Sequence, residues 1–217
     1  MAVQKIISPE AFEKPLWEQG FTRIMGLDEV GRGCLAGPVV AAGVILDPDT
    51  IPDGIFDSKQ VSPKKRLQLS EQIKAHATYW TIQVCSPAEI DEYNILWASL
   101  RAMDRCASAT GAQPDYLLVD GNRYLPVLLP HQCVVKGDSR CVSIAAASIL
   151  AKVYRDELMT ALHTSYPEFG WDRNVGYPTR EHYDALACHG ITPLHRRSFK
   201  LRTSLEYPDK DRSNGLS

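Results

Sequence analysis

The stretch "FTRIMGLDEVGRGCLAGPVVAAGVIL" (residues 21–46) contains two apolar runs separated by a glycine-rich loop. The first run ends beside two adjacent acids, Asp28 and Glu29, and its composition predicts a strand over residues 21–28. The second run, residues 38–46, is continuously apolar and rich in β-branched side chains, which is typical of a buried strand. The connecting loop is too long for a two-residue hairpin, so its glycines indicate a tight turn or a close approach to another molecule.

Apolar runs and helical patterns continue along the chain to about residue 190. Ser62 and Pro63, for example, are typical of the first turn of a helix. We expect further strands over residues 79–86, 115–121 and 132–138, and helices over residues 62–77, 94–110, 139–163 and 180–190. Short buried strands separated by helices predict an α/β protein with a mixed sheet and helices on its faces.

The bulk composition is that of an ordinary globular protein. The chain has 217 residues, of which 44% are hydrophobic and 23% charged, and its formal net charge is −2. This charge argues against a broadly basic surface but allows a local basic track. No stretch has the features of a signal peptide, and no apolar run reaches the roughly 20 residues that span a bilayer.

The cysteines and histidines do not form a metal-binding pattern. The six cysteines are scattered without a CxxC pair, and the six histidines lack the spacing of a pair on one helix face. We therefore expect reduced thiols in a cytoplasmic protein, and neither a disulfide framework nor a zinc site.

Further acids follow later apolar runs. Asp120 ends the run "YLLVD", and Asp138 follows "VVKG". If these runs are neighbouring strands, both carboxylates gather with Asp28 and Glu29 at one edge of the sheet, where α/β proteins tend to bind ligands. Clustered carboxylates repel one another unless a cation neutralises them, and hard oxygen ligands favour Mg²⁺ or Mn²⁺. Such a site suits phosphoryl chemistry with two metal ions.

Each acid also has a simpler structural explanation. Asp120 with Gly121 could form a plain Asp-Gly turn, and Asp138 could cap a helix. Glu29 could face solvent, because adjacent side chains of a strand point to opposite sides. The occurrence of all these acids at the ends of apolar runs favours the shared site.

Taken together, the motifs resemble those of the ribonuclease HII family from about Gly26 to Phe199. The matching segments are "GLDEVGRGCLAGPVVAAGVIL" (26–46), "DSK" (57–59), "VDGN" (119–122), "KGDSRCVSIAAASILAKVYRD" (136–156), "GYPT" (176–179) and "HRRSF" (195–199). The resemblance implies an RNase H-like fold, with a five-stranded mixed sheet, flanking helices and a C-terminal helical extension. It implies an N-terminal extension (1–20), a catalytic core (21–164), a substrate-contacting region (165–205) and a polar tail (206–217), which we expect to be disordered.

The same resemblance implies an activity and its residues. The enzyme would cleave the RNA of RNA–DNA hybrids and nick duplex DNA 5′ to an embedded ribonucleotide, leaving 3′-hydroxyl and 5′-phosphate ends. The metal-binding catalytic set would be Asp28, Glu29, Asp120 and Asp138, with Mn²⁺ or Mg²⁺. We expect no membrane partner and a monomer.

Residues that would contact the substrate also follow from the resemblance. The backbone of Gly31, Arg32 and Gly33 would read the ribose 2′-hydroxyl, which distinguishes RNA from DNA. Tyr177 would stack on the deoxyribose after the ribonucleotide, although a Tyr-Pro pair is otherwise typical of core packing. Lys59 would hold a phosphate, although a loop lysine is more often simply solvated.

Two basic groups could contact the duplex backbone without reading bases. The first is Lys64, Lys65 and Arg66, and the second is Arg196, Arg197, Lys200 and Arg202. The first group could equally be the polar face of a helix.

Three other functions compete with this interpretation. A ribonuclease HIII is expected to carry a sizeable N-terminal domain, whereas here Asp28 follows only a short segment. A non-catalytic hybrid-binding module is expected to lack one of the acids. A metal-dependent phosphatase acting on small molecules is not expected to need Tyr177 or the basic C-terminal group.

Overall fold

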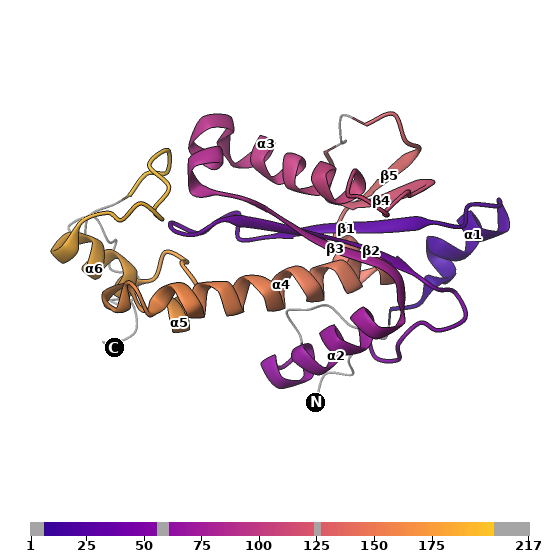
Figure 1. Cartoon of the computed structure of the whole chain (residues 1–217), viewed down its shortest axis with the longest axis horizontal. Coiled ribbons are helices and arrows are strands. Elements are labelled where there is room, and N and C mark those ends of the chain that lie inside the picture. The colour runs from indigo at the N-terminus through magenta and orange to yellow at the C-terminus, as the bar shows by residue number, and fades with distance from the viewer. Residues whose placement is uncertain (1–6, 56–60, 124–126, 202–217) are drawn as a thin grey trace, which may run out of the picture.

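The computed structural model describes residues 7–55, 61–123 and 127–201 (Figure 1). In chain order its elements are η1 (Pro9–Ala11), α1 (Glu13–Glu18), β1 (Ile24–Val30), β2 (Val39–Leu46), α2 (Pro63–His76), β3 (Ala77–Cys85), α3 (Pro87–Ala107), β4 (Tyr116–Asp120), β5 (His131–Val134), η2 (Gly137–Ser139), α4 (Val142–His163), η3 (Pro167–Phe169), α5 (Trp171–Asn174) and α6 (Arg180–His189). Within these residues, none of the helices is long and apolar enough to cross a membrane.

The strands form one mixed sheet in the order β3-β2-β1-β4-β5. β1 pairs antiparallel with β2 and parallel with β4, so the sheet changes direction at its central strand. β2 and β3 pair antiparallel, while β4 and β5 pair parallel. The predicted mixed sheet with flanking helices and a helical C-terminal part is confirmed.

Helices cover both faces of the sheet because both faces are apolar. On one side Leu27 and Ala41 pack in a cluster with residues of α3. On the other side Val40, Ala42 and Val44 pack in a cluster with residues of α2 and α4. Figure 1 shows α3 on one side of the sheet, and α2 and α4 on the other.

Helix α4 approaches the sheet closely because β1 carries a glycine beneath it. A Cβ atom on Gly26 would lie only 2.2 Å from the backbone carbon of Ser143. The helix presents small buried residues, Ala145, Ala146 and Ala147, in its first turns. This close packing fixes α4, which carries residues that reach the site described below.

The first turn of α4 is capped from another element. The N-cap residue, Cys141, makes no side-chain capping bond. Instead the buried Glu13 of α1 accepts hydrogen bonds from Ser143 N (2.8 Å), Ser143 Oγ (2.7 Å) and Cys141 Sγ (2.8 Å). A carboxylate at a helix N-terminus is favourable because the N–H groups there lack partners within the helix. The described part of the predicted N-terminal extension is therefore packed on the core.

Several element boundaries differ from expectation: β1, for example, runs from Ile24 to Val30 and does not end at Asp28. The two largest differences have local reasons. α3 begins at Pro87 and not at residue 94, because Ser86 and Glu89 form a reciprocal capping box. Asn94 has φ 66° and kinks the helix there. The expected strand 132–138 ends at Val134, since Lys136 adopts a left-handed conformation and residues 137–139 form a 3₁₀ turn.

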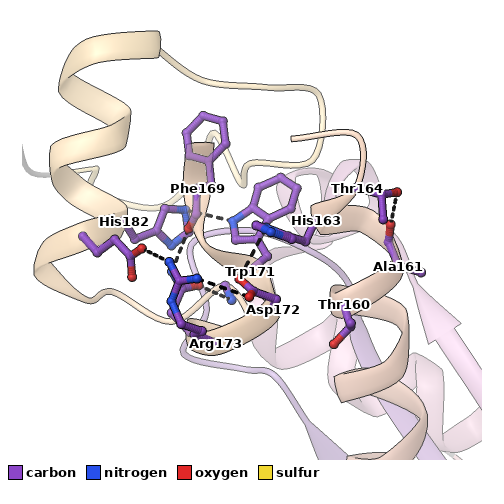
Figure 2. Close-up of polar contacts among 12 residues, drawn as sticks. Thr160, Ala161, His163, Thr164, Phe169, Trp171, Asp172, Arg173 and His182 are labelled. Atoms are coloured by element: carbon purple, nitrogen blue, oxygen red, sulfur yellow. Dashed lines mark hydrogen bonds and ion pairs between the residues drawn. The ribbon is translucent and has the colours of Figure 1, made fainter. Parts of the chain in front are cut away.

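The C-terminal part forms a small apolar cluster at the far end of α4. Phe169 stacks on Trp171, and Trp171 Nε1 donates to His182 Nε2 (3.3 Å; Figure 2). On the surface Arg173 pairs with Asp172 and Glu181. The predicted tail lies outside the described residues, as does the whole "DSK" motif with Lys59.

Candidate active site

The predicted acids come together because β1 and β4 are parallel neighbours. Leu27 of β1 pairs with Val119 of β4, so the residues that follow each of them, Asp28 and Asp120, lie side by side at one edge of the sheet. Asp28 is only 6% exposed. The strand order therefore satisfies the main geometric condition for a shared site.

Asp138 joins this edge through the turn after β5. The backbone N–H of Gly137 donates to Asp120 Oδ1 (2.7 Å), which ties the turn to the end of β4. A Cβ on Gly137 would lie 3.2 Å from that oxygen and 2.5 Å from Ile144 Cδ1, so the approach is too close for a larger residue. Asp138 itself is 7% exposed within this turn. We call Asp28, Glu29, Asp120 and Asp138 the acidic edge.

The carboxyl of Asp28 is close enough to the other three acids to be influenced by their charges. Burial raises the pKa of the Asp28 carboxyl well above its ordinary value, and the charges of Glu29, Asp120 and Asp138 raise it further. A hydrogen bond from Ser148 of α4 opposes this rise. Protonation of Asp28 is therefore favoured by its burial and by the three neighbouring acids.

Glu29 differs from Asp28 in its surroundings. It lines an open hollow together with α3 and the segment after β4: Arg32, Leu96, Ser99, Leu100, Met103, Asp120, Gly121, Asn122 and Arg123. Arg32 Nη1 lies 3.0 Å from Glu29 Oε1. Burial raises the pKa of the Glu29 carboxyl, and the Arg32 charge partly offsets that rise.

The acidic edge is not a preformed metal cage. Among the described residues, no three or more His, Cys, Asp or Glu side chains are grouped so that they could hold a metal ion. Protein donors already engage these carboxylates: Glu29 N bonds Asp28 Oδ1 (2.8 Å), and Gly137 N bonds Asp120 Oδ1. Adjacent residues of a strand also point to opposite sides, which separates Asp28 from Glu29.

The acidic edge nonetheless fits divalent cations in its chemistry. All its donors are carboxylate oxygens, the ligands that Mg²⁺ and Mn²⁺ prefer. Burial, and then the charges of the neighbouring acids, raise the pKa of Asp28, and a bound cation would offset the repulsion among these acids. Side-chain rotations about the backbone would be needed to bring these oxygens to a bound ion.

A loop of residues 31–38, which we call the glycine loop, follows directly after β1. Gly31 has φ 93° and is buried, whereas Arg32 and Gly33 are exposed. Glycine tolerates this left-handed conformation, which strains other residues. The structure therefore places exposed backbone beside the acidic edge, as expected from the sequence.

Arg196 is located differently from its expected place on the surface. Its side chain is fully buried and donates to the carbonyl oxygens of Gly31 (2.7 Å), Arg32 (2.9 Å) and Gly37 (3.0 Å). The expectation that Arg196 reaches the duplex backbone is therefore corrected: the guanidinium has its donors inside the protein. Its neighbour Arg197 is exposed.

Tyr177 lies close to the glycine loop. It is 37% exposed, and its hydroxyl interacts with the Cys34 thiol. Backbone bonds join its segment to the loop, because Leu35 N donates to Gly176 O (2.8 Å). The Tyr177 ring is thus partly packed against the protein and partly exposed to solvent.

Sequence reasoning missed Arg155 and the pair His182–His195. Arg155 is a fully buried arginine within α4 whose donors all reach backbone carbonyls. His182 Nε2 lies 3.0 Å from His195 Nε2 in the C-terminal cluster. Nothing in the local pattern distinguishes these residues from exposed polar ones, so only the tertiary structure reveals them.

Solved structures that share this fold are ribonucleases H. The ribonuclease H2 from Pyrococcus horikoshii OT3 matches with a TM-score of 0.71 and 25% identity, over 82% of this chain and 94% of that chain. A more distant ribonuclease HIII, solved in complex with Mn²⁺, matches with a TM-score of 0.64 and 20% identity, over 82% of this chain and 67% of that chain. Together, fold and acidic edge define a nuclease of the RNase H-like class.

Sequence comparison narrows this class to one family. The family model for ribonuclease HII matches residues 25–202. The ribonuclease HII of Salinibacter ruber is 54% identical over 193 residues, which are 87% of this chain and 96% of that protein. The chain belongs to the ribonuclease HII family, which confirms the resemblance. It is a ribonuclease H, a hydrolase of the type that acts as an endonuclease on RNA–DNA hybrids.

Proposed function

We propose that this ribonuclease H also nicks duplex DNA on the 5′ side of an embedded ribonucleotide, and that it leaves 3′-hydroxyl and 5′-phosphate ends. The observation that carries the proposal is the adjacency of two features. The acidic edge holds four interacting carboxylates, and the glycine loop begins two residues after Glu29. Strand β1 thus carries two of the carboxylates and continues directly into the loop that would contact the ribose.

In this proposal the four carboxylates hold two divalent ions, Mg²⁺ or Mn²⁺. When bound, these ions would supply an activated water and neutralise charge on the leaving oxygen. Asp28 and Asp120 lie side by side, Asp138 approaches from the turn after β5, and Glu29 faces the hollow. The Mn²⁺ in the related ribonuclease HIII supports this choice of ion.

The protein's own groups bind and orient the substrate. The backbone of Gly31, Arg32 and Gly33 meets the ribose 2′-hydroxyl, since a main-chain donor or acceptor there can distinguish RNA from DNA. The half-exposed ring of Tyr177 stacks on the next deoxyribose. Lys59 and the exposed Arg197 bind phosphates, which orients the duplex without reading its bases.

We further propose a monomeric enzyme that acts in the cytoplasm. All six cysteines are free thiols, and four of them are buried, which suits a reducing compartment. Light scattering during size-exclusion chromatography tests the monomer, because a dimer would elute with twice the mass of 24.2 kDa.

A nicking assay tests the proposed function. The protein is incubated with duplex DNA that contains one ribonucleotide, in Mg²⁺, in Mn²⁺ and in chelator, with an all-DNA duplex as the control. We expect one nick, 5′ to the ribonucleotide, in metal only. Absence of nicking in both metals, or an equal nick in the all-DNA duplex, would refute the proposal.

A further inference from the structure

Two arginines are buried beneath the glycine loop without a carboxylate partner. Arg155 and Arg196 are both 0% exposed. In the described part of the chain, neither forms an ion pair with an acidic side chain. Burying a cation is costly unless its donors are satisfied. Here six backbone carbonyl oxygens satisfy them, three for each guanidinium.

Arg155 joins the glycine loop to the segment that carries Tyr177. Its Nε donates to Pro38 O (3.1 Å) and its Nη2 to Ala36 O (3.2 Å), both in the loop. Its Nη1 donates to Val175 O (2.8 Å), two residues before Tyr177. One planar guanidinium with a rigid fork of donors therefore fixes the loop relative to that segment.

The segment at Val175 is itself held in an uncommon conformation. Val175 has φ 43°, and left-handed backbone is strained for a β-branched residue. The next residue, Gly176, has no room for a side chain, since its Cβ would lie 2.5 Å from Ala36 O. The bond from Arg155 to Val175 O thus helps to maintain a backbone path that the sequence does not favour locally.

Arg196 orients the peptide groups of the glycine loop. It holds the carbonyl oxygens of Gly31 and Arg32, and no described peptide bond is cis. In a trans peptide the N–H points opposite to the C=O. The N–H groups of Arg32 and Gly33 therefore point away from Arg196, toward the exposed side of the loop.

Arg155 also explains why residue 31 must be glycine. A Cβ on Gly31 would lie 2.2 Å from Arg155 Nε and 2.9 Å from its Cζ. The guanidinium occupies the space that any side chain at this position would need. The loop and both arginines are thus packed as one unit with the segment of Tyr177.

We propose that Arg155 and Arg196 are positioning residues that fix the spacing between the outward N–H groups of the glycine loop and the ring of Tyr177, and that they thereby set selectivity for a ribonucleotide followed by a deoxyribonucleotide. The inference rests on the proposed function, in which these two elements contact consecutive sugars. Small misplacements of such elements cost large factors in rate. Neither arginine touches the substrate, so both act through the loop and Tyr177.

The test uses a duplex with several consecutive ribonucleotides followed by DNA in one strand. This substrate offers cleavage before the last ribonucleotide, at the junction, and cleavage at internal ribonucleotides. The ratio of the junction product to the internal products is measured for the wild type, Arg155→Lys, Arg196→Lys and the matched control Arg173→Lys. A loss of folded protein lowers both products equally, so the ratio reports positioning and not stability.

We expect the ratio of the junction product to the internal product to fall about tenfold in Arg155→Lys and in Arg196→Lys. A lysine ammonium cannot replace a planar guanidinium that donates to three carbonyl oxygens. Arg173→Lys, at an exposed surface pair, should keep the wild-type ratio. The ratio should also fall in Tyr177→Ala, and Arg155→Lys combined with Tyr177→Ala should fall no further than the larger single effect. Wild-type ratios in both lysine variants, or additive effects with Tyr177→Ala, would overturn the inference.

Hydrogen exchange in the unsubstituted protein tests the same geometry if a lysine variant does not fold. The amides of Leu35 and Gly37, bonded to Gly176 O and Leu194 O, should exchange slowly. Those of Arg32 and Gly33 should exchange quickly, and slow exchange there would overturn the inference. If the wild type nicks no ribonucleotide substrate, the proposed function fails; if it nicks and the lysine variants keep its ratio, only the positioning inference fails.

Discussion

The acidic edge and the glycine loop are neighbours along β1, yet their interactions differ. At the acidic edge the carboxylates repel one another, and the pKa of Asp28 is raised. In the glycine loop, buried guanidinium donors satisfy the carbonyl oxygens of five residues: Gly31, Arg32, Ala36, Gly37 and Pro38.

This difference shows which part of the site needs a ligand to be complete. A bound cation would offset the repulsion among the four carboxylates of the acidic edge further than the Arg32–Glu29 ion pair does. The glycine loop is held in place by protein groups, so under the proposed function it would meet the ribose without rearrangement. Catalysis should therefore depend on metal far more than substrate docking does.

The largest expected effect comes from Asp120→Asn. Removing one carboxylate from the acidic edge should lower nicking by roughly 10³-fold or more, because electrostatic stabilisation of the transition state is lost. Duplex binding, measured by fluorescence anisotropy, should change little, since the docking surface is intact. The matched control Asp184→Asn, which changes an exposed surface acid, should leave nicking unchanged.

The same Asp120→Asn variant should melt at a higher temperature than the wild type in metal-free buffer. Removing a negative charge relieves the repulsion that raises the pKa of Asp28, and an amide oxygen can still accept the bond from Gly137 N. A lower melting temperature, or a loss of binding equal to the loss of nicking, would contradict the difference between the two regions.

The next largest effect should come from Gly26→Ala, which would disturb helix α4, the helix that contacts both the acidic edge and the glycine loop. α4 carries Ser148, which bonds Asp28, and Arg155, which holds the glycine loop. Gly26→Ala would force α4 away from β1 and should destabilise the fold by about 1–3 kcal/mol. Thermal melting measures this loss, and Gly33→Ala, whose Cβ would meet no atom within 4 Å, should melt like the wild type. Equal melting of both variants would contradict the close packing of α4.

Acid should affect the acidic edge and the His182–His195 pair of the C-terminal cluster in opposite directions. Thr192 N donates to His195 Nδ1, so His195 Nε2–H donates to His182 Nε2, and His182 Nδ1–H donates to Tyr177 O. Both rings are therefore neutral, and a proton added to either would place N–H against N–H. Burial lowers the pKa of His182, and burial together with His182 lowers the pKa of His195 to about 4.

The sign of the pH effect follows from these shifts. Below pH about 6.5 these histidines bind protons in the unfolded chain but stay neutral in the folded protein. The free energy of unfolding that they contribute therefore falls as the pH drops toward 4, by up to about 1.4 kcal/mol per pH unit for each ring. Asp28, whose pKa is raised, contributes with the opposite sign. Denaturant unfolding between pH 7 and 5 should show that His195→Asn loses less stability on acidification than the wild type does, whereas the exposed His189→Gln should follow the wild type. An identical pH dependence in His195→Asn and the wild type would refute the neutral pair.

The smallest effect should come from Arg197→Ala. Arg197 is exposed, so it should contribute one phosphate contact and no base reading. Binding should weaken only a few-fold, and the slope of log affinity against log salt should decrease by about one unit. An unchanged slope would show that Arg197 does not contact the duplex.

The neighbouring positions of Asp28 and Asp120 could be predicted from the sequence because each acid follows an apolar run, and strand order brings these two runs together. Asp28 and Asp120 needed only the parallel pairing of β1 and β4 to become neighbours. The start of α3 was also readable, since Ser86 and Glu89 have the spacing of a capping box. The predicted start at residue 94 is wrong because Asn94 is a non-helical residue inside a longer helix that begins at Pro87.

The buried arginines could not be predicted in the same way. Arg196 lies in the basic motif "HRRSF", where two adjacent arginines differ in burial: Arg196 is buried and Arg197 is exposed. Arg155 lies in a long helix whose polar residues look alike in sequence. Their burial depends on carbonyl oxygens contributed by residues more than a hundred positions away, such as Ala36 and Pro38 for Arg155.

Diffraction from crystals grown with Mn²⁺ and a ribonucleotide-containing duplex tests the central claim directly, because anomalous scattering locates the manganese. The four carboxylates of the acidic edge should rotate to bind the ions, with the glycine loop unmoved against the ribose. Manganese bound elsewhere, with Asp28, Glu29, Asp120 and Asp138 away from the scissile phosphate, would contradict the account.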